Sequence, residues 1–256
     1  MKEGKAAIIS DIHGNLPALE AVLKDIDEKG ITEIYCAGDI VGYGARPNEC
    51  VETVKSRGIK CVRGNHDHDA VAENEDFLKV YSALAGHTMV WTRKILKQRN
   101  KDFLQELSYV IDTPLFHLVH GDLRIPRDFF DGYIHSAYHA RCIFPSMQKQ
   151  FCFIGHTHIA EVFYEDGEDV KIKIPFDNND GKFVFGARTI VNAGSVGQPR
   201  LKGDRAKDPR AGYVVFTPPN SIEFVKVEYD IKLAQDQIKD AGLPISLALI
   251  LEQKTI

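Results

Sequence analysis

Apolar residues in the first third of the chain form short continuous runs that alternate with helix-spaced stripes. The runs lie at residues 6–10, 31–37 and 59–62, and the stripes between them begin at Pro17 and extend over 47–57. Short apolar runs that end at glycine-containing turns indicate buried strands, and proline favours the first turn of a helix. This alternation predicts a parallel sheet whose strand ends face one side.

The rest of the chain predicts a helix-rich stretch followed by a second series of strands. Between about residues 70 and 110, Tyr81 and Trp91 belong to apolar stripes for which plain core packing is the simplest interpretation. A C-terminal helix begins near residue 231. Two sheets with helices outside accommodate this many strands, so we expect one domain over residues 1–256 with a helical insertion at about 70–110. The further strand-like segments lie at 116–119, 151–154, 160–164, 170–174, 188–191 and 213–227, the last interrupted by a turn at 218–220.

Composition narrows the class of protein. The 256 residues carry a formal net charge of −4, which gives no reason to expect binding driven by the nucleic-acid backbone. No apolar run reaches the roughly 18–20 residues that a membrane span needs, and the N-terminus lacks an apolar cleavable signal. Five cysteines without CxxC spacing argue against a disulfide framework and favour a reducing cytoplasm. The chain also contains ten histidines, and none of these arguments explains them.

Half of these histidines lie in five turns that share one design, in which an apolar strand ends at a turn carrying glycine and a possible metal ligand. Ligands collect beyond the carboxyl ends of strands in open α/β sheets, so the turns can converge on one pocket. Together they supply three carboxylates, one amide oxygen and five imidazoles. The turns are Asp11-Ile12-His13, Gly38-Asp39, Gly64-Asn65-His66-Asp67, Val119-His120-Gly121 and Gly155-His156-Thr157-His158.

The ligand types favour a transition metal. Residues two apart on an extended segment point the same way, so Asp11 with His13, or His156 with His158, could hold one ion or two adjacent ions. Carboxylate and imidazole without thiolate suit Mn, Fe, Co, Ni or Zn. The set exceeds the four ligands that one zinc would take, and two ions about 3.5–4 Å apart suit in-line displacement at phosphorus.

Each turn alone has an ordinary structural explanation. A lone HxH or DxH is more often a surface or strand-end feature, Asp39 could cap a helix or turn, and Asn65 suits any turn. The glycines near Tyr43 and Ser195 match neither a nucleotide-binding fingerprint nor a GxSxG nucleophile elbow. Independent structural coincidences should not all lie at strand ends, so the five turns together indicate a shared function.

These five blocks, in this order, resemble the calcineurin-like metallophosphoesterase family from about residue 5 to 200. The segment from Asn192 to Arg200, Asn-Ala-Gly-Ser-Val-Gly-Gln-Pro-Arg, is similar to one in its small bacterial and archaeal phosphodiesterase-like branch. The resemblance implies an α/β fold, a four-layer αββα sandwich of two mixed β-sheets flanked by helices, with a dinuclear metal centre at the sheet ends.

The resemblance also implies roles for individual residues. Asp39 would bridge the ions and His66, oriented by Asp67, would stabilise charge on the phosphate or protonate the leaving oxygen, while a hydroxide bridging the two metals attacks in line. One divalent ion would be held by Asp11, His13, Asp39 and His158, and the other by Asp39, Asn65, His120 and His156.

This chain departs from the family's motifs at a residue that would bind the substrate. Protein phosphatases and diadenosine tetraphosphate hydrolases of the family resemble GDxVDRG followed by GNHE, whereas this chain has GDIVGYG at 38–44 and GNHD at 64–67, without the phosphate-binding arginine. Arg200, Arg46 or Arg124 could replace it, a solvated surface position being the simpler interpretation for the last two. Asn15, Arg200 and His68 are the candidate substrate contacts.

The sequence therefore predicts a cytoplasmic, metal-dependent hydrolase of small phosphorylated substrates, most simply a phosphodiesterase, with two divalent ions such as manganese. Nucleic acid enters only as a candidate substrate, and no membrane partner is expected. The alternatives are a phosphomonoesterase or protein phosphatase, a dinucleoside polyphosphate hydrolase, and a non-catalytic scaffold on the same fold. The sequence does not specify the oligomeric state.

Overall fold

Two mixed β-sheets form the centre of the computed structural model, which describes residues 4–126, 132–177, 179–200 and 208–252. The first sheet has the strand order β3-β2-β1-β11-β12-β9, and the second has the order β4-β5-β6-β10-β7-β8. The strands are β1 (Ala6–Ile9), β2 (Glu33–Cys36), β3 (Lys60–Cys61), β4 (Val110–Asp112), β5 (Phe116–Val119), β6 (Phe151–Ile154), β7 (Glu161–Asp166), β8 (Asp169–Lys173), β9 (Lys182–Val184), β10 (Thr189–Asn192), β11 (Ala211–Thr217) and β12 (Ser221–Val227). The α-helices are α1 (Leu16–Glu28), α2 (Pro47–Ser56), α3 (Asn65–Val71), α4 (Ala83–Ile95), α5 (Gln98–Glu106), α6 (Ala137–Ile143), α7 (Ile231–Asp240) and α8 (Ile245–Leu251), with 3₁₀ turns at Asp76–Lys79 and Phe144–Ser146.

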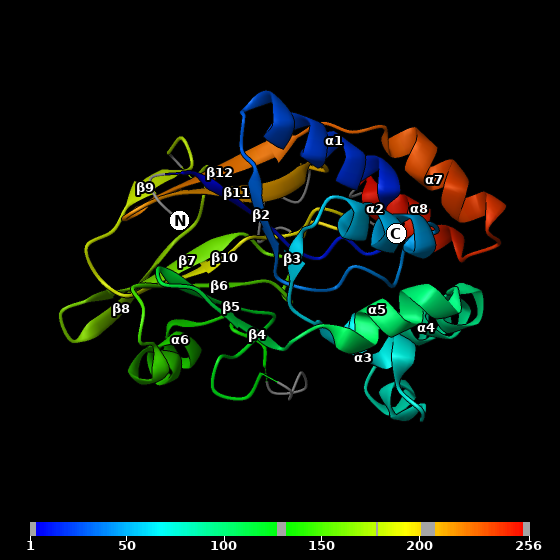
Figure 1. The fold of residues 1–256 in the computed structure, drawn as a ribbon, viewed down its shortest axis with the longest axis horizontal. Coiled ribbons are helices and arrows are strands. Elements are labelled where there is room, and N and C mark those ends of the chain that lie inside the picture. The colour runs from blue at the N-terminus through cyan, green and yellow to red at the C-terminus, as the bar shows by residue number, and fades with distance from the viewer. Residues whose placement is uncertain (1–3, 127–131, 178, 201–207, 253–256) are drawn as a thin grey trace.

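The sheets face each other and helices cover their outer sides (Figure 1). Strand β1 shows how the sequence specifies these layers. Ala6 and Ile8 pack between the sheets, whereas Ala7 and Ile9 pack in the cluster beneath α1 and α2. Because successive side chains of a strand point to opposite faces, a strand buried on both faces reads as a continuous apolar run. The predicted sandwich of two mixed sheets flanked by helices is confirmed.

Aromatic residues fill the space between the sheets. The rings of Phe116 and Phe153 meet edge to face at 5.1 Å, and Phe216 from the opposite sheet lies 5.8 Å from Phe116 and 5.4 Å from Phe153. Such pairs add about 0.5–1.5 kcal/mol each beyond the area they bury. This cluster holds the two sheets, and therefore the loops at their ends, in a fixed relation.

Some elements differ from the prediction. The strand expected at 59–62 is shortened to Lys60–Cys61, with Val62 in an isolated bridge to Ser108, and the three-residue strands β4 and β9 were not anticipated. The helix from residue 231 is two helices, because Gly242 adopts a left-handed backbone conformation and Pro244 follows it. None of the described helices combines the length and apolarity needed to cross a bilayer.

Candidate metal centre

Five of the predicted metal ligands share a left-handed backbone that non-glycine residues rarely adopt. The strain costs about 1–3 kcal/mol at each position and persists only where the surroundings enforce it. Here the loops enforce it on one another, since the amide of Asp11 donates to the Gly38 carbonyl at 2.9 Å and that of His13 to the Asp39 carbonyl at 2.9 Å. The φ angles are 53° at Asp11, 50° at His13, 58° at Asp39, 71° at His156 and 62° at His158.

Asp11, His13 and His158 form the first group of converging ligand atoms. His13 Nε2 lies 2.9 Å from His158 Nε2, and Asp11 Oδ1 lies 3.4 Å from His158 Nε2 and 3.7 Å from His13 Nε2. All three side chains are buried.

The second ring nitrogens of these histidines determine the tautomers. His13 Nδ1 donates to the Val41 carbonyl at 3.0 Å, and His158 Nδ1 donates to the Gln198 carbonyl at 2.8 Å. Because a carbonyl only accepts, both Nδ1 atoms carry a hydrogen, and in its neutral form each ring directs a lone pair from Nε2 into the same space. Two lone pairs and a carboxylate oxygen facing one another suit a bound cation between them.

Asp39, His120 and His156 form the second group, and Asn65 joins it. His120 Nδ1 lies 2.7 Å from the Ala37 carbonyl, so in the neutral form of the ring Nε2 again offers a lone pair. That Nε2 is 3.0 Å from His156 Nδ1, 3.1 Å from Asn65 Oδ1 and 3.3 Å from Asp39 Oδ2. The same Asp39 oxygen is 3.7 Å from His13 Nε2, so it lies between the two groups.

Charge in this buried pocket is strongly coupled. Although burial raises it, the pKa of Asp39 is held well below its usual range by the imidazoles of His120, His66 and His13. Conversely, burial lowers the pKa of His120, but the Asp39 and Asp11 carboxylates together raise it to about 10. Without a metal, a proton on His120 therefore neutralises the carboxylates. A divalent cation would take that place when it binds.

His66 lies against both groups within a set of rings. Its ring centroid is 4.8 Å from those of His13 and Tyr43 and 5.0 Å from that of Tyr81. Burial lowers the pKa of His66 to about 3, and its Nδ1 has no hydrogen-bond partner. A methyl group on Gly42 would overlap that nitrogen, which accounts for glycine there. His66 also forms a third possible ligand group with His13 and Asp39.

The Asp67 carboxylate is held by backbone amides. It accepts hydrogen bonds from the amides of Asp39 at 2.8 Å, Ile40 at 2.9 Å and Val41 at 3.2 Å, and from Gly64 at 3.1 Å. Burial and the Asp39 charge raise its pKa to about 7. The carboxylate therefore fixes the loop that carries Asp39. That it also orients the His66 ring stays a prediction.

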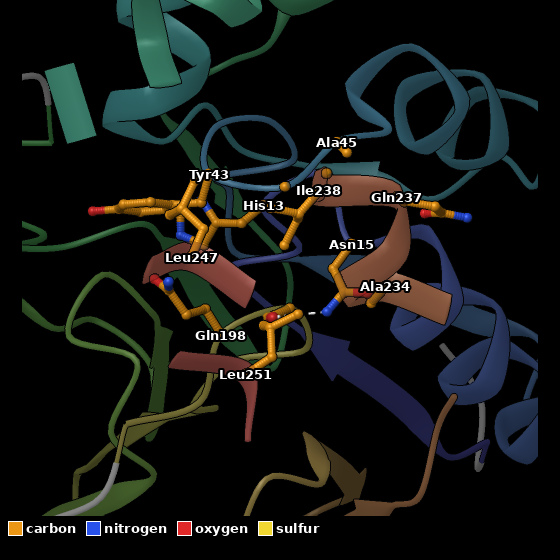
Figure 2. A pocket seen from close by; sticks show the side chains of 13 residues that line it. His13, Asn15, Tyr43, Ala45, Gln198, Ala234, Gln237, Ile238, Leu247 and Leu251 are labelled. Atoms are coloured by element: carbon orange, nitrogen blue, oxygen red, sulfur yellow. Dashed lines mark hydrogen bonds between the residues drawn. The ribbon is translucent and has the colours of Figure 1, made fainter. Parts of the chain in front are cut away.

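Two of the three candidate substrate contacts have hydrogen-bond partners within the protein. Asn15 caps α1, accepting from the Ala18 amide at 3.2 Å, and donates to the Gly197 carbonyl at 2.9 Å (Figure 2). It borders a cavity of about 20 Å³ beside His13. His68 Nδ1 lies 2.8 Å from the Tyr109 hydroxyl.

Arg200 is the candidate that the structure brings to the site. Its amide donates to the His158 carbonyl at 3.0 Å, and its guanidinium bonds the Tyr43 hydroxyl. After burial, the charge of Arg200 is the largest cause lowering the pKa of His158. The other two arginines pair elsewhere, Arg46 with Glu49 at 3.5 Å and Arg124 with Asp122 at 2.5 Å.

Three tyrosines near the site were not predicted as functional. Tyr43 packs on His13 and His66, Tyr81 on His66, and the exposed Tyr133 ring lies 3.7 Å from that of His156. Tyr81 also hydrogen-bonds Asn65, so plain core packing does not describe it. Of these three, only Tyr43 could have been linked to the site from sequence, because it lies in the glycine-rich turn after Asp39.

Comparisons with known proteins agree with this geometry. A family model described as "Calcineurin-like phosphoesterase superfamily domain" matches residues 5–217. Over 255 residues the chain is 37% identical to an uncharacterized protein, MJ0912, of Methanocaldococcus jannaschii, covering 95% of this chain and 96% of that one. It is similar to the crystal structure of a metallophosphoesterase from Sphaerobacter thermophilus, with 36% identity, a TM-score of 0.83 and coverage of 98% and 100%. A hypothetical protein, PH1004, from Pyrococcus horikoshii OT3 shares the fold at 22% identity, with a TM-score of 0.76 and 97% of each chain covered.

Proposed function

The chain belongs to the calcineurin-like phosphoesterase superfamily, and on that premise we propose that it is a phosphodiesterase that uses two divalent metal ions. One ion would be bound by Asp11, His13, Asp39 and His158, and the other by Asp39, Asn65, His120 and His156. The supporting observation is the convergence of imidazole nitrogens and carboxylate oxygens in two groups, with Asp39 Oδ2 between them.

The donor set fits such ions. Imidazole and carboxylate with one amide oxygen suit Mn, Fe, Co, Ni or Zn, and the buried Nδ1 hydrogen bonds to Val41, Gln198 and Ala37 would hold the rings in the required tautomers. When bound, the ions would polarise the phosphoryl group and lower the pKa of a water that serves as the nucleophile.

The chain's own residues would orient the substrate around that centre. His66 is not needed to complete either set of four, so we assign it to the phosphate, where an N–H would stabilise charge on the phosphoryl or leaving oxygen. Asp67 would act through the loop it bonds, by placing the Asp39 carboxylate. Arg200, with its guanidinium at Tyr43, would bind a non-bridging phosphate oxygen.

The preference for diesters rests on charge. A phosphodiester carries one negative charge, whereas a monoester dianion carries more, and this site offers a single arginine in place of the family's GDxVDRG arginine. The alternatives that use the same chemistry are a phosphomonoesterase or protein phosphatase and a dinucleoside polyphosphate hydrolase. The scaffold alternative is disfavoured because every ligand position holds a suitable side chain. The five free cysteines suit a cytoplasmic location.

A substrate panel with and without chelation tests the proposal. We expect chelated protein to lose hydrolysis of bis-p-nitrophenyl phosphate and to regain it with Mn²⁺, with p-nitrophenyl phosphate and a phosphopeptide cleaved more slowly. Faster cleavage of the monoester or the phosphopeptide would overturn the diester assignment. Full activity after rigorous chelation would overturn the metal-dependent mechanism.

A further inference from the structure

The helices between α3 and β4 bring one hydroxyl into contact with the proposed metal centre. Tyr81 lies just before α4, and its hydroxyl oxygen is 2.7 Å from Asn65 Nδ2. Ser82 next to it caps α4 by accepting from the Ala85 amide at 3.2 Å. The position of Tyr81 over α3 is therefore fixed by the start of a thirteen-residue helix.

Asp69 is the second partner of that hydroxyl. Burial raises the pKa of Asp69 to about 6, while its hydrogen bond with Tyr81 opposes that rise. Asp69 lies one helical turn after Asn65 on α3, so both can reach a group placed over the same face of the helix. A carboxylate accepts only, so the Tyr81 hydrogen points to Asp69 and its oxygen is left to accept from Asn65.

This direction decides which end of the Asn65 amide faces the metal groups. With Nδ2 donating to Tyr81, Oδ1 lies 3.1 Å from His120 Nε2, in the second ligand group. The opposite rotamer would present N–H groups to that space, and an N–H cannot ligate a cation.

We propose that Asp69 and Tyr81 are positioning residues that orient Asn65 as a ligand of the second metal ion. This deepens the proposed function and rests on it. The proposal also gives a function to the helical segment between α3 and β4. This segment supplies none of the predicted ligands, but Tyr81 within it selects the rotamer of Asn65. Hydrogen-bond partners of ligands typically change metal affinity by 10- to 100-fold when removed.

The test is metal binding by Tyr81→Phe, which removes the hydroxyl and keeps the ring that packs on His66. Metal-free protein is titrated with Mn²⁺ by calorimetry, and bound manganese is counted after desalting. We expect about 10- to 100-fold weaker binding of the second ion and unchanged binding of the first. Asp69→Ala should give a similar loss, and the double variant no more than either one, because both break the same chain of hydrogen bonds.

Tyr109→Phe is the matched control. Tyr109 also places its hydroxyl against a side chain of α3, at 2.8 Å from His68 Nδ1, and it accepts from Arg63 Nη1 at 3.3 Å; neither partner is a predicted ligand. This variant should bind both ions as the wild type does. In an Asn65→Asp background, Tyr81→Phe should change the second affinity by less than about twofold, since a carboxylate offers an oxygen in either rotamer.

The outcomes separate this proposal from the function it rests on. Wild-type binding of two ions with an unaltered second affinity in Tyr81→Phe would overturn the positioning role alone. An equal loss in the Asn65→Asp background would also overturn it, because Tyr81 would then act on the fold and not through the amide. A wild-type chain that binds fewer than two ions would contradict the proposed dinuclear centre, and the positioning role with it.

Discussion

Individual side chains of the site are constrained from two directions, by backbone strain and by hydrogen bonds to their second atoms. His13 combines a φ of 50° with an Nδ1 hydrogen bond to the Val41 carbonyl, so neither its backbone nor its ring can relax. Such over-determination is typical of functional sites and is costly for any other purpose. It is the residue-scale reason to regard these imidazoles as ligands.

His66 gives the sharpest residue-scale prediction. His66→Ala should retain two bound ions and lower kcat by about 100- to 1,000-fold, because one hydrogen-bond donor to the phosphoryl group is lost. Metal content and steady-state hydrolysis of bis-p-nitrophenyl phosphate are measured on the same sample. His87→Ala, an exposed position on α4, is the control and should match the wild type.

The contrary result has a defined meaning. Loss of one ion from His66→Ala would show that the third ligand group, with His13 and Asp39, is the one in use. His66 would then be a ligand and the assignment of its ring to the phosphate would be wrong.

The ligand types and their strand-end positions could be predicted from sequence, because each lies in a turn next to an apolar run. The partners of Asp67 and Asn15 could not. Asp67 bonds amides 26–28 residues away, and Asn15 bonds Gly197 across 182 residues. Tyr81 was missed for a related reason. Its place in an apolar stripe indicates burial, and nothing local shows that its hydroxyl reaches Asn65.

At the scale of elements, the C-terminal helices support the site from behind. Helices α7 and α8 form an apolar cluster that includes Tyr43 and Ala45 from the loop after Asp39. Figure 2 shows Leu247 near Tyr43 and Gln198 at the cavity beside His13. These helices therefore hold in place the loop whose tyrosine packs on His13 and His66.

Leu247→Ala tests this support. Leu247 is 1% exposed, so its truncation should lower the free energy of unfolding by about 2–5 kcal/mol. Urea unfolding of the metal-free protein gives the value. Leu233→Ala on α7, where the side chain is 46% exposed, should change it by less than about 0.5 kcal/mol. Equal effects of the two substitutions would contradict the packing of α8 against the loop.

Element prediction succeeded where strands are buried on both faces and failed where they are short. Strands β1 and β6 read as continuous apolar runs and β5 as a run interrupted only by His117, whereas β4 and β9 are three residues long and partly exposed. Their pairing depends on neighbouring strands far away in the chain, as β9 does on β12. Gly242 causes the break between α7 and α8 and is present in the sequence. The break was missed because the helix was predicted from the pattern of apolar residues alone.

For the whole molecule, the two sheets and their aromatic interface bring together loops from residues 11 to 158. A net charge of −4 suits an anionic substrate only if positive charge is supplied locally, and bound cations would supply it. Because such cations bind the folded chain, they would also stabilise it, by about 2.7 kcal/mol per site at a hundredfold excess over Kd.

The measurement that tests the central claim most directly is hydrolysis of bis-p-nitrophenyl phosphate as a function of bound metal. Metal-free protein is loaded stepwise with Mn²⁺, and both the ions per chain and the rate are determined at each step. The account predicts a rate that is negligible without metal and reaches its maximum at two ions per chain, with Asp39→Asn failing to reach it at any loading. A maximal rate with no ion or with one ion per chain would contradict it.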